Sequence, residues 1–188
     1  MISGENLFAV VLPAGGLGLR MGGQIPKQLL PLKGKPVYRH SLDTFLSLKE
    51  ISEVVLAVPQ DWKEHFENEI LNAGISTEWK NKLKIVVGGK ERWQSVRHGV
   101  EAITSNAKYV LVHDVARPFI SKELLTQIFE TLVSKGSCIV AKECADTVKV
   151  VTNGKIEKTL DRNSIWLAQT PQCASVELLK NLYQKIDK

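Results

Sequence analysis

Glycines and positive charges directly follow an apolar run near the start of the chain. The run, Leu7–Leu12, leads into Pro13, and five of the nine residues from Gly15 to Gly23 are glycines. Arg20 lies within this glycine-rich loop, and Lys27 follows shortly after it. Backbone N–H groups that no Cβ shields, together with two cations, suit a polyphosphate ligand. The spacing therefore predicts a phosphate-binding loop, and an ordinary surface turn is the alternative.

This loop differs from the two commonest glycine-rich nucleotide motifs. A dinucleotide-binding G-x-G-x-x-G pattern that starts at Gly16 meets Met21 where its third glycine belongs. No Gly-Lys-Ser/Thr tripeptide follows, so the Walker pattern is absent as well. An NAD-linked oxidoreductase is therefore a weakly supported function for this chain.

Two later segments carry similar groups where strands are expected to end. Gly88-Gly89 opens an expected helix, so its free N–H groups and the Ser95 hydroxyl could contact a base or a ribose. Asp114 follows another apolar run and is placed to bind Mg²⁺ through a carboxylate oxygen. A simpler alternative for Gly88-Gly89 is an ordinary turn between a strand and a helix. Asp114 could instead cap a turn or form an ion pair with Arg117. Three such strand ends on one sheet favour a shared site.

Apolar strands alternate with amphipathic segments along most of the chain. This order predicts an α/β fold of the Rossmann-like type, a mostly parallel sheet flanked by helices. Ligands bind such sheets beyond the carboxyl ends of the strands. The expected strands are 7–12, 54–58, 85–87, 109–112 and 138–141. The expected helices run from Pro36 to about Leu48, from an Asp61 cap to about Asn72, along the face of Val96, Val100 and Ile103, and from a Ser121 cap.

The segment 147–160 interrupts this alternation. Two runs of alternating residues flank Asn153-Gly154, which is a strong signal for a β-hairpin. A lone hairpin is marginally stable in water, so it must pack on its own domain or on another chain. The pattern alone leaves both possibilities open. Because no linker divides the chain, we expect one domain over 1–188 with a hairpin arm at about 144–163.

The composition is typical of a soluble globular protein. Hydrophobic residues make up 44% and charged residues 24%, and the net charge of +5 is spread without any block of like charge, so nucleic-acid binding is not expected. Cys138, Cys144 and Cys173 form no C-x-x-C pair, which disfavours a disulfide framework or a zinc site. The polar start of the chain and its short first apolar run match neither a signal peptide nor a membrane span. We therefore expect a cytoplasmic protein with no membrane contact.

The histidines show no metal-ligand spacing and no arrangement typical of nucleophilic catalysis. His113 precedes Asp114, but neighbours on a strand point to opposite faces, so a packed or hydrogen-bonded histidine is expected rather than an acid–base pair. The pattern favours charge-stabilised phosphoryl chemistry over covalent catalysis.

With these residues in view, the chain resembles the 2-C-methyl-D-erythritol 4-phosphate cytidylyltransferases of the non-mevalonate isoprenoid pathway. The resemblance is ordered along almost the whole chain. Its motifs are Pro13-Ala14-Gly15-Gly16-x-Gly18-x-Arg20-Met21, Pro26-Lys27-Gln28, Gly88-Gly89-x-x-Arg92-x-x-Ser95-Val96, His113-Asp114-x-Ala116-Arg117-Pro118, Asp146-Thr147-Val148-Lys149, Asp161-Arg162-Asn163 with Trp166, and Gln169-Thr170-Pro171-Gln172. The ribitol-5-phosphate cytidylyltransferases share the loop, a His-Asp-x-x-Arg-Pro motif and the Thr-Pro-Gln, but not the Leu160-Asp161-Arg162 and Trp166 combination. They are the alternative.

The resemblance implies a nucleotidyltransferase that uses CTP, a sugar-alcohol phosphate and Mg²⁺, with Arg20, Lys27 and Arg162 as its catalytic residues. It implies that Asp114 binds the metal. It also implies a homodimer, in which the hairpin arm of the neighbouring subunit supplies Thr147 and Arg162. The implied nucleotide-binding residues are Pro13, Ala14, Gly15, Gly16, Gly18, Gly89 and Ser95, and the implied acceptor-binding residues are Arg117, Thr147 and Arg162.

Two departures from the family pattern bear on these expectations. Lys90 stands where the family often has an acidic residue, beside the implied nucleoside contacts. The sequence ends at Lys188, whereas the family continues with an acidic segment and a final strand whose lysine contacts the substrate phosphate. A non-catalytic nucleotide-binding module is therefore a further alternative.

Overall fold

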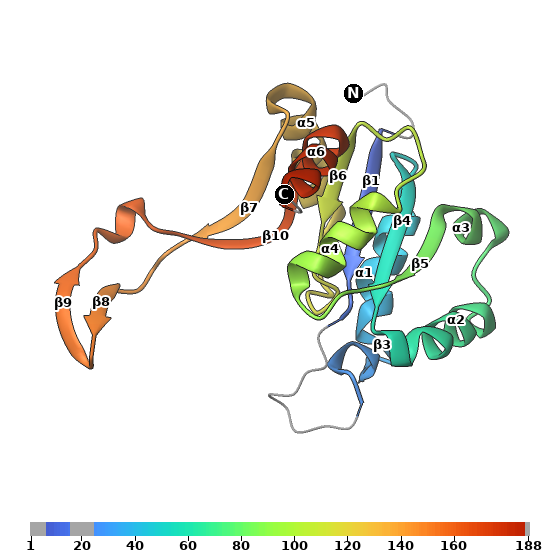
Figure 1. Ribbon diagram of the computed structural model, residues 1–188, viewed down its shortest axis with the longest axis horizontal. Helices are drawn as coiled ribbons and strands as arrows, with labels where there is room; N and C mark the ends of the chain where they lie inside the picture. Colours follow the sequence, from blue (N-terminus) through green and yellow to red (C-terminus); the bar gives the residue numbers. More distant parts are fainter. Residues whose placement is uncertain (1–6, 16–24, 187–188) are drawn as a thin grey trace.

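A six-stranded sheet with helices on both faces forms the body of the molecule (Figure 1). The computed structural model describes residues 7–15 and 25–186. The strand order is β5-β4-β1-β6-β10-β7. The strands of this sheet are β1 (Phe8–Pro13), β4 (Ile51–Val58), β5 (Leu83–Val87), β6 (Tyr109–Val112), β7 (Cys138–Glu143) and β10 (Trp166–Ser175). The helices are α1 (Val37–Leu46), α2 (Lys63–Asn72), α3 (Thr77–Lys82), α4 (Arg92–Glu101), α5 (Lys122–Lys135) and α6 (Val176–Ile186).

The sheet is mostly parallel, as the sequence predicts. β1 pairs in parallel with β4 and β6, and β4 pairs in parallel with β5. β10 is the exception, because it runs antiparallel to both β6 and β7. The sequence pattern does not predict β10, because Pro171 interrupts the segment. In the structure, the pairing of β10 with β7 shifts register between Ala168 and Gln172.

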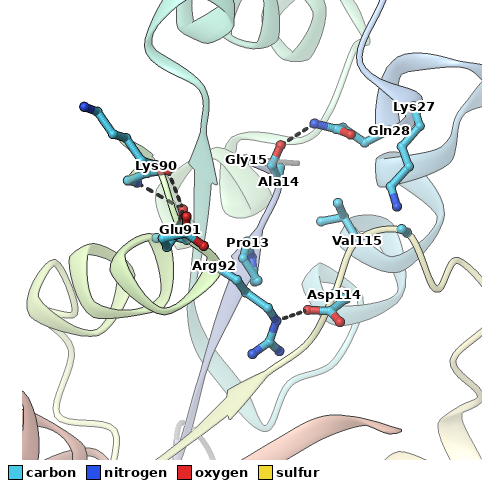
Figure 2. A pocket seen from close by; sticks show the side chains of 13 residues that line it. Pro13, Ala14, Gly15, Lys27, Gln28, Lys90, Glu91, Arg92, Asp114 and Val115 are labelled. Atoms are coloured by element: carbon cyan, nitrogen blue, oxygen red, sulfur yellow. Dashed lines mark hydrogen bonds and ion pairs between the residues drawn. The ribbon is translucent and has the colours of Figure 1, made fainter. Parts of the chain in front are cut away.

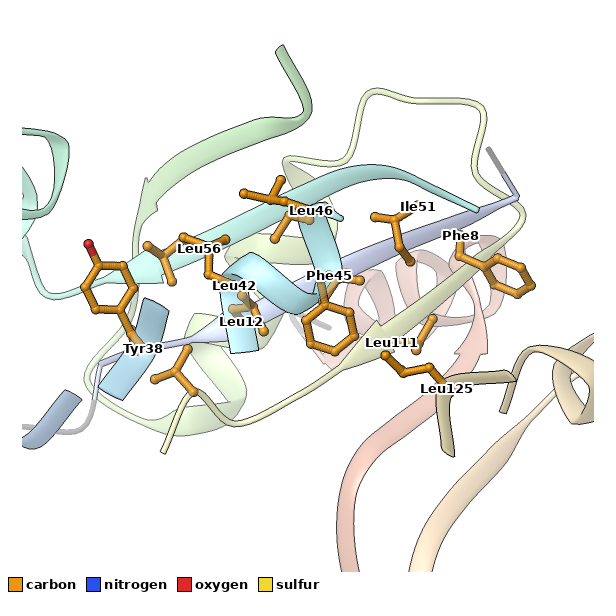
Figure 3. Close-up of a cluster of buried hydrophobic side chains, with 14 of the residues drawn as sticks. Phe8, Leu12, Tyr38, Leu42, Phe45, Leu46, Ile51, Leu56, Leu111 and Leu125 are labelled. Atoms are coloured by element: carbon orange, nitrogen blue, oxygen red, sulfur yellow. The ribbon is translucent and has the colours of Figure 1, made fainter. Parts of the chain in front are cut away.

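β1 is apolar throughout because both of its faces are buried. Phe8, Val10 and Leu12 belong to one cluster, which packs with residues of α1, α2 and α5 (Figure 3). Ala9 and Val11 face the other way, into a smaller cluster with α4 and α6. The alternation along one strand thus joins two helical layers through a single central sheet.

Three predicted helix starts can be compared with the structure. α1 begins directly after Pro36, and the Ser121 hydroxyl accepts a hydrogen bond from the Leu124 N–H at the start of α5, as predicted. The predicted Asp61 cap is wrong. Asp61 lies inside the short 3-10 helix η3 (Gln60–Trp62), so α2 starts two residues later without a side-chain cap.

The predicted hairpin is confirmed by the structure. It comprises β8 (Lys149–Thr152) and β9 (Lys155–Thr159), joined by Asn153 and Gly154 with φ angles of 50° and 77°. Two consecutive positive φ angles are those of a tight hairpin turn, which Asn-Gly adopts readily. Figure 1 shows this arm extending away from the sheet, between β7 and β10, instead of folding back over the body.

Within the described part of the chain, no helix combines the length and apolarity needed to cross a bilayer.

Candidate active site

The three segments expected to lie at strand ends meet in one pocket of about 230 Å³ (Figure 2). They follow β1, β5 and β6, which end at the same edge of the sheet. The lining includes three cationic and two acidic side chains. The lining residues are Pro13, Ala14, Gly15, Lys27, Gln28, Gly89, Lys90, Glu91, Arg92, Ser95, Asp114, Val115 and Ala116. The three strand ends therefore line one pocket, which is the geometry that a shared site requires.

The first wall is anchored where the glycine-rich loop begins. The Ala14 N–H donates to the Ala57 carbonyl of β4 over 2.7 Å. The Ala14 carbonyl in turn accepts a hydrogen bond from the Gln28 side chain, which is only 1% exposed. Lys27 precedes Gln28 in the short helix η2 (Lys27–Leu29), and Figure 2 shows it on the opposite side of the pocket from Lys90. The buried Gln28 thus fixes the backbone that carries Lys27.

The second wall is formed by the Gly88-Gly89 turn and the start of α4, where the sequence predicts free N–H groups. The Gly89 N–H is not free, because it donates to Ser95 Oγ over 3.0 Å. Ser95 is 1% exposed, and its hydroxyl lies 3.3 Å from the Gly89 carbonyl and 3.4 Å from the Glu91 carbonyl. Glu91 and Gln94 form a capping box that uses further N–H groups at the start of α4. The Gly88 N–H is bonded as well, because it donates to the Val58 carbonyl over 2.8 Å. The two N–H groups that were expected to contact a nucleoside therefore already have partners within the chain.

Gly15 lies tightly against this second wall. A Cβ at Gly15 would be 3.1 Å from Ser95 Oγ, and a Cβ at Gly88 would be 2.7 Å from the same atom. The Ser95 hydroxyl therefore lies between the two glycine segments, where larger residues would force it to move. Its position explains why glycines and a small hydroxyl residue meet at this point.

The third wall carries Asp114. Its Oδ1 accepts a hydrogen bond from Arg92 Nε over 2.8 Å, in an ion pair whose two side chains are both partly exposed. The partner of the carboxylate is therefore Arg92, and not Arg117 as one alternative had it. Arg117 instead donates its backbone N–H to the Asp114 carbonyl over 2.9 Å, which closes a short turn.

The Asp114 carboxylate in this setting fits Mg²⁺ that is shared with a nucleotide. Mg²⁺ commonly binds one or two carboxylates, waters and substrate phosphates, instead of a cage made only of protein groups. The described residues contain no group of three or more His, Cys, Asp or Glu side chains suited to a metal. Asp114 lies among cations that suit phosphates, so it fits a Mg²⁺ ion bound by one carboxylate together with waters and substrate phosphates.

His113 is packed and hydrogen-bonded, as predicted. Its ring is 1% exposed and meets Phe45 edge-on at a centroid distance of 5.4 Å. Burial lowers the pKa of the imidazole, although the hydrogen bond to the Arg117 carbonyl opposes this shift. Burial therefore favours the neutral form of the ring, and His113 is not among the residues that line the pocket.

The predicted acceptor-binding residues lie outside this pocket. Arg117 follows the lining residue Ala116, and its guanidinium donates to the Gln169 side chain. Thr147 and Arg162 belong to the arm region, where Arg162 donates to the Ala145 carbonyl over 3.2 Å. Within a single chain, the structure does not bring Thr147 and Arg162 to the pocket.

Comparison with known proteins gives the family of this chain. The family model described as 2-C-methyl-D-erythritol 4-phosphate cytidylyltransferase matches residues 8–188. The chain belongs to this family.

Relatives by sequence carry the name of this family. The chain is 38% identical over 185 residues to the chloroplastic 2-C-methyl-D-erythritol 4-phosphate cytidylyltransferase of Oryza sativa subsp. japonica, covering 98% of this chain and 60% of the relative. It is 37% identical over 179 residues to the Lachnospira eligens protein of that name, covering 95% of this chain and 76% of the relative.

Solved structures show the same fold. A 4-diphosphocytidyl-2C-methyl-D-erythritol synthase from Anaerococcus prevotii aligns with a TM-score of 0.80 and 28% identity, covering 96% of this chain and 75% of that chain. The Francisella tularensis 2-C-methyl-D-erythritol 4-phosphate cytidylyltransferase aligns with a TM-score of 0.77 and 30% identity, covering 96% of this chain and 77% of that chain.

Membership of the methylerythritol phosphate cytidylyltransferase family confirms the predicted family, fold class and enzyme class. It favours this family over the ribitol-5-phosphate alternative, and an enzyme over a non-catalytic module or an NAD-linked oxidoreductase. Among the predicted nucleotide-binding and catalytic residues, Gly16, Gly18 and Arg20 lie outside the described residues.

Three residues that lie in or beside the pocket have contacts that the sequence pattern did not predict. Gln28 anchors the first wall, Arg92 pairs with Asp114, and Thr170 contacts the Asp114 backbone. All three belong to the motifs that carry the resemblance, which was the available signal. Their partners are 14, 22 and 56 residues away, so spacing alone does not reveal what they contact.

Proposed function

We propose that this chain transfers the cytidylyl group of CTP to 2-C-methyl-D-erythritol 4-phosphate and releases pyrophosphate. The observation that carries the proposal is the pocket at the ends of β1, β5 and β6. It gathers three cations and the Asp114 carboxylate in a member of the methylerythritol phosphate cytidylyltransferase family.

The reaction is a direct displacement at the α-phosphorus of CTP. A phosphate oxygen of the acceptor forms a bond to that phosphorus, and the bond to the β-phosphate oxygen breaks, so pyrophosphate leaves with its electron pair. A phosphate monoester dianion is already nucleophilic, so the site needs no strong general base. The main requirement is to bring two anions together and to stabilise the charge of the transition state.

The residues of the chain divide this work. Lys27, together with Arg20 of the glycine-rich loop, neutralises the triphosphate, and the loop from Pro13 onward wraps it. Asp114 is the residue that would hold Mg²⁺, which supplies further neutralisation of phosphate charge when bound. The Ser95 hydroxyl supports the Gly88-Gly89 turn beneath the nucleoside instead of contacting the base with a free donor.

The acceptor half of the site involves a second subunit. Arg117 lies beside the pocket, whereas Thr147 and Arg162 lie on an arm that extends away from the body of its own chain (Figure 1). The arm also exposes Val151 and Ile156, which are 54% and 65% accessible, and a hairpin with such side chains needs a surface to cover it. We propose a homodimer whose arms complete each other's sites, in the cytoplasm.

A pyrophosphate-release assay tests the function. It pairs CTP, ATP, GTP or UTP with methylerythritol phosphate or ribitol phosphate, with Mg²⁺ and with a chelator. We expect release only with CTP, methylerythritol phosphate and Mg²⁺ together. Preference for ribitol phosphate would overturn the acceptor assignment. Nucleotide binding without release for any acceptor would overturn the catalytic function.

A further inference from the structure

Thr170 of β10 contacts the turn that carries Asp114. Its hydroxyl oxygen lies 3.3 Å from the Asp114 N–H nitrogen and 3.2 Å from His113 Nδ1. Thr170 is 8% exposed and His113 is 1% exposed, so water does not readily replace these hydrogen bonds. Both residues lie outside the pocket lining, and nothing in the proposed reaction uses them directly.

The hydrogen bonds of this group can be given a single direction. His113 Nε2 lies 3.0 Å from the Arg117 carbonyl, which can only accept, so Nε2 carries the proton. In the neutral ring Nδ1 is then an acceptor, and the Thr170 hydroxyl donates to it. The lone pairs of the Thr170 oxygen are left to accept the Asp114 N–H. In this series of hydrogen bonds, which runs from Asp114 through Thr170 and His113 to Arg117, each donor therefore has one acceptor.

This chain of bonds holds both ends of one turn. Asp114 is held through its N–H, and Arg117 through its carbonyl, while the Arg117 N–H donates to the Asp114 carbonyl over 2.9 Å. Gln169, the neighbour of Thr170, accepts from the Arg117 guanidinium. Two adjacent residues of β10 thus fix the backbone of the proposed metal ligand and the side chain of a proposed acceptor-binding arginine.

We propose that Thr170 and His113 are positioning residues that set the Asp114 carboxylate and the Arg117 guanidinium at a fixed separation. The inference rests on the proposed function, since it assigns these two groups to metal and acceptor binding. Ala14 and Gly15 follow β1, and Ser95 lies in α4, which follows β5. This part of the pocket does not depend on the hydrogen bonds that link Asp114, Thr170, His113 and Arg117.

The position of β10 accounts for this arrangement. β10 is antiparallel to β6 and brings its residue Gln172 opposite Val112, the last residue of β6. Thr170 is therefore carried just past the end of β6, where His113 and Asp114 begin. A parallel strand between β6 and β7 would present its carboxyl end here instead of an internal segment.

A pair of substitutions separates the hydroxyl from the shape of the side chain. Thr170→Val keeps the volume and removes the hydroxyl, and Thr170→Ser restores it. We expect Thr170→Val to lower kcat and to raise the KM for methylerythritol phosphate, by on the order of 10-fold each, because misplaced groups lose orientation. The KM for CTP should stay within about twofold, and Thr170→Ser should recover most of the loss.

The matched control is Thr126→Val, an exposed threonine of α5 whose hydroxyl bonds within its own helix. It should leave all three constants unchanged. An equal rise in both KM values with a lowered melting temperature would assign Thr170 a merely structural role. Unchanged constants in Thr170→Val, with an active parent enzyme, would also overturn the inference.

A second measurement does not need turnover. ¹⁵N NMR of the imidazoles, with His113→Gln to identify the signals, should show His113 neutral with its proton on Nε2. Thr170→Val should shift the Nδ1 resonance, because it removes the donor to that atom. A proton on Nδ1, or an Nδ1 resonance that Thr170→Val leaves unchanged, would overturn the proposed hydrogen bond from Thr170 to His113. Failure of the proposed function would instead appear as no pyrophosphate release by the parent, with this NMR signature intact.

Discussion

Lys27 owes its place in the pocket to the residue beside it. Gln28 is buried and donates to the Ala14 carbonyl, which ties η2 to the end of β1. The ammonium group of Lys27 can therefore reach the pocket from a backbone that is already fixed. A positioned cation stabilises developing phosphate charge more effectively than a mobile one, because it needs little reorganisation.

We predict that Lys27→Ala lowers pyrophosphate release by on the order of 10²–10³-fold, because one positioned cation is lost from the transition state. The melting temperature should not change, since Lys27 is on the surface of the pocket. Steady-state assays and thermal unfolding measure both quantities. Lys122→Ala, which removes an exposed lysine at the start of α5, is the control. Near-normal turnover in Lys27→Ala would contradict the role given to this residue.

At the scale of elements, Glu53 links β4 to the loop between α4 and β6. Its carboxylate accepts the Thr104 and Ser105 N–H groups over 2.9 and 2.8 Å, and it pairs with Lys84 of β5 over 3.0 Å. Burial alone would raise the pKa of this carboxyl. The Ser105 N–H, Lys84 and the Thr104 N–H together hold the pKa below its usual value of 4.5. This link lies at the edge of the sheet away from the pocket, since it joins the segments that precede β6.

We predict that Glu53→Gln lowers the free energy of unfolding at pH 7 by on the order of 2 kcal/mol, because charged hydrogen bonds are replaced by weaker ones. The pKa is lowered in the folded state, so the stabilisation is fully present above the unfolded-state pKa. It is lost as the pH falls through the folded-state pKa. The difference between the two proteins in urea unfolding should therefore shrink at pH values well below 4.5.

The control for Glu53→Gln is Glu101→Gln, which removes an exposed partner of Arg97 in an i,i+4 ion pair. Such a surface pair contributes about 1 kcal/mol or less. If both substitutions destabilise the protein equally, the Glu53 carboxylate does not have the role assigned to it.

At the scale of the whole molecule, the arm extends away from the sheet (Figure 1), and no residue of the arm lines the pocket at the strand ends. A site assembled from both therefore needs two chains, each giving its arm to the other. In a two-fold dimer this exchange is reciprocal, and both sites are equivalent. Activity of such an enzyme depends on dimer formation, which a mixing experiment can detect.

We predict that an inactive Lys27→Ala chain and an inactive Arg162→Ala chain restore activity when they exchange subunits. Half of the dimers are then mixed, and one of the two sites in each has both residues, so activity should reach about a quarter of the unsubstituted value. Mixing Lys27→Ala with the double variant Lys27→Ala, Arg162→Ala leaves no such site and should restore nothing. A mixture no more active than its separate parts would show that Arg162 acts within its own chain.

The sequence by itself determined the features that depend on residues close together in the chain. The doubly buried run of β1, the Asn153-Gly154 turn and the Ser121 cap are each specified by residues close together in the chain, and the structure confirms all three. The meeting of three strand ends also followed from sequence, because parallel strands that alternate with helices end at one edge.

Only the tertiary structure decided which groups at that edge are free and which are already bonded. Ser95 closes on Gly89, Arg92 pairs with Asp114, and Thr170 holds the Asp114 backbone. The last contact depends on β10 running antiparallel between β6 and β7, and no periodicity in its sequence predicts that placement. Hydrogen bonds between distant segments depend on strand order and register, whereas local spacing reports only the conformation of the segment that contains it.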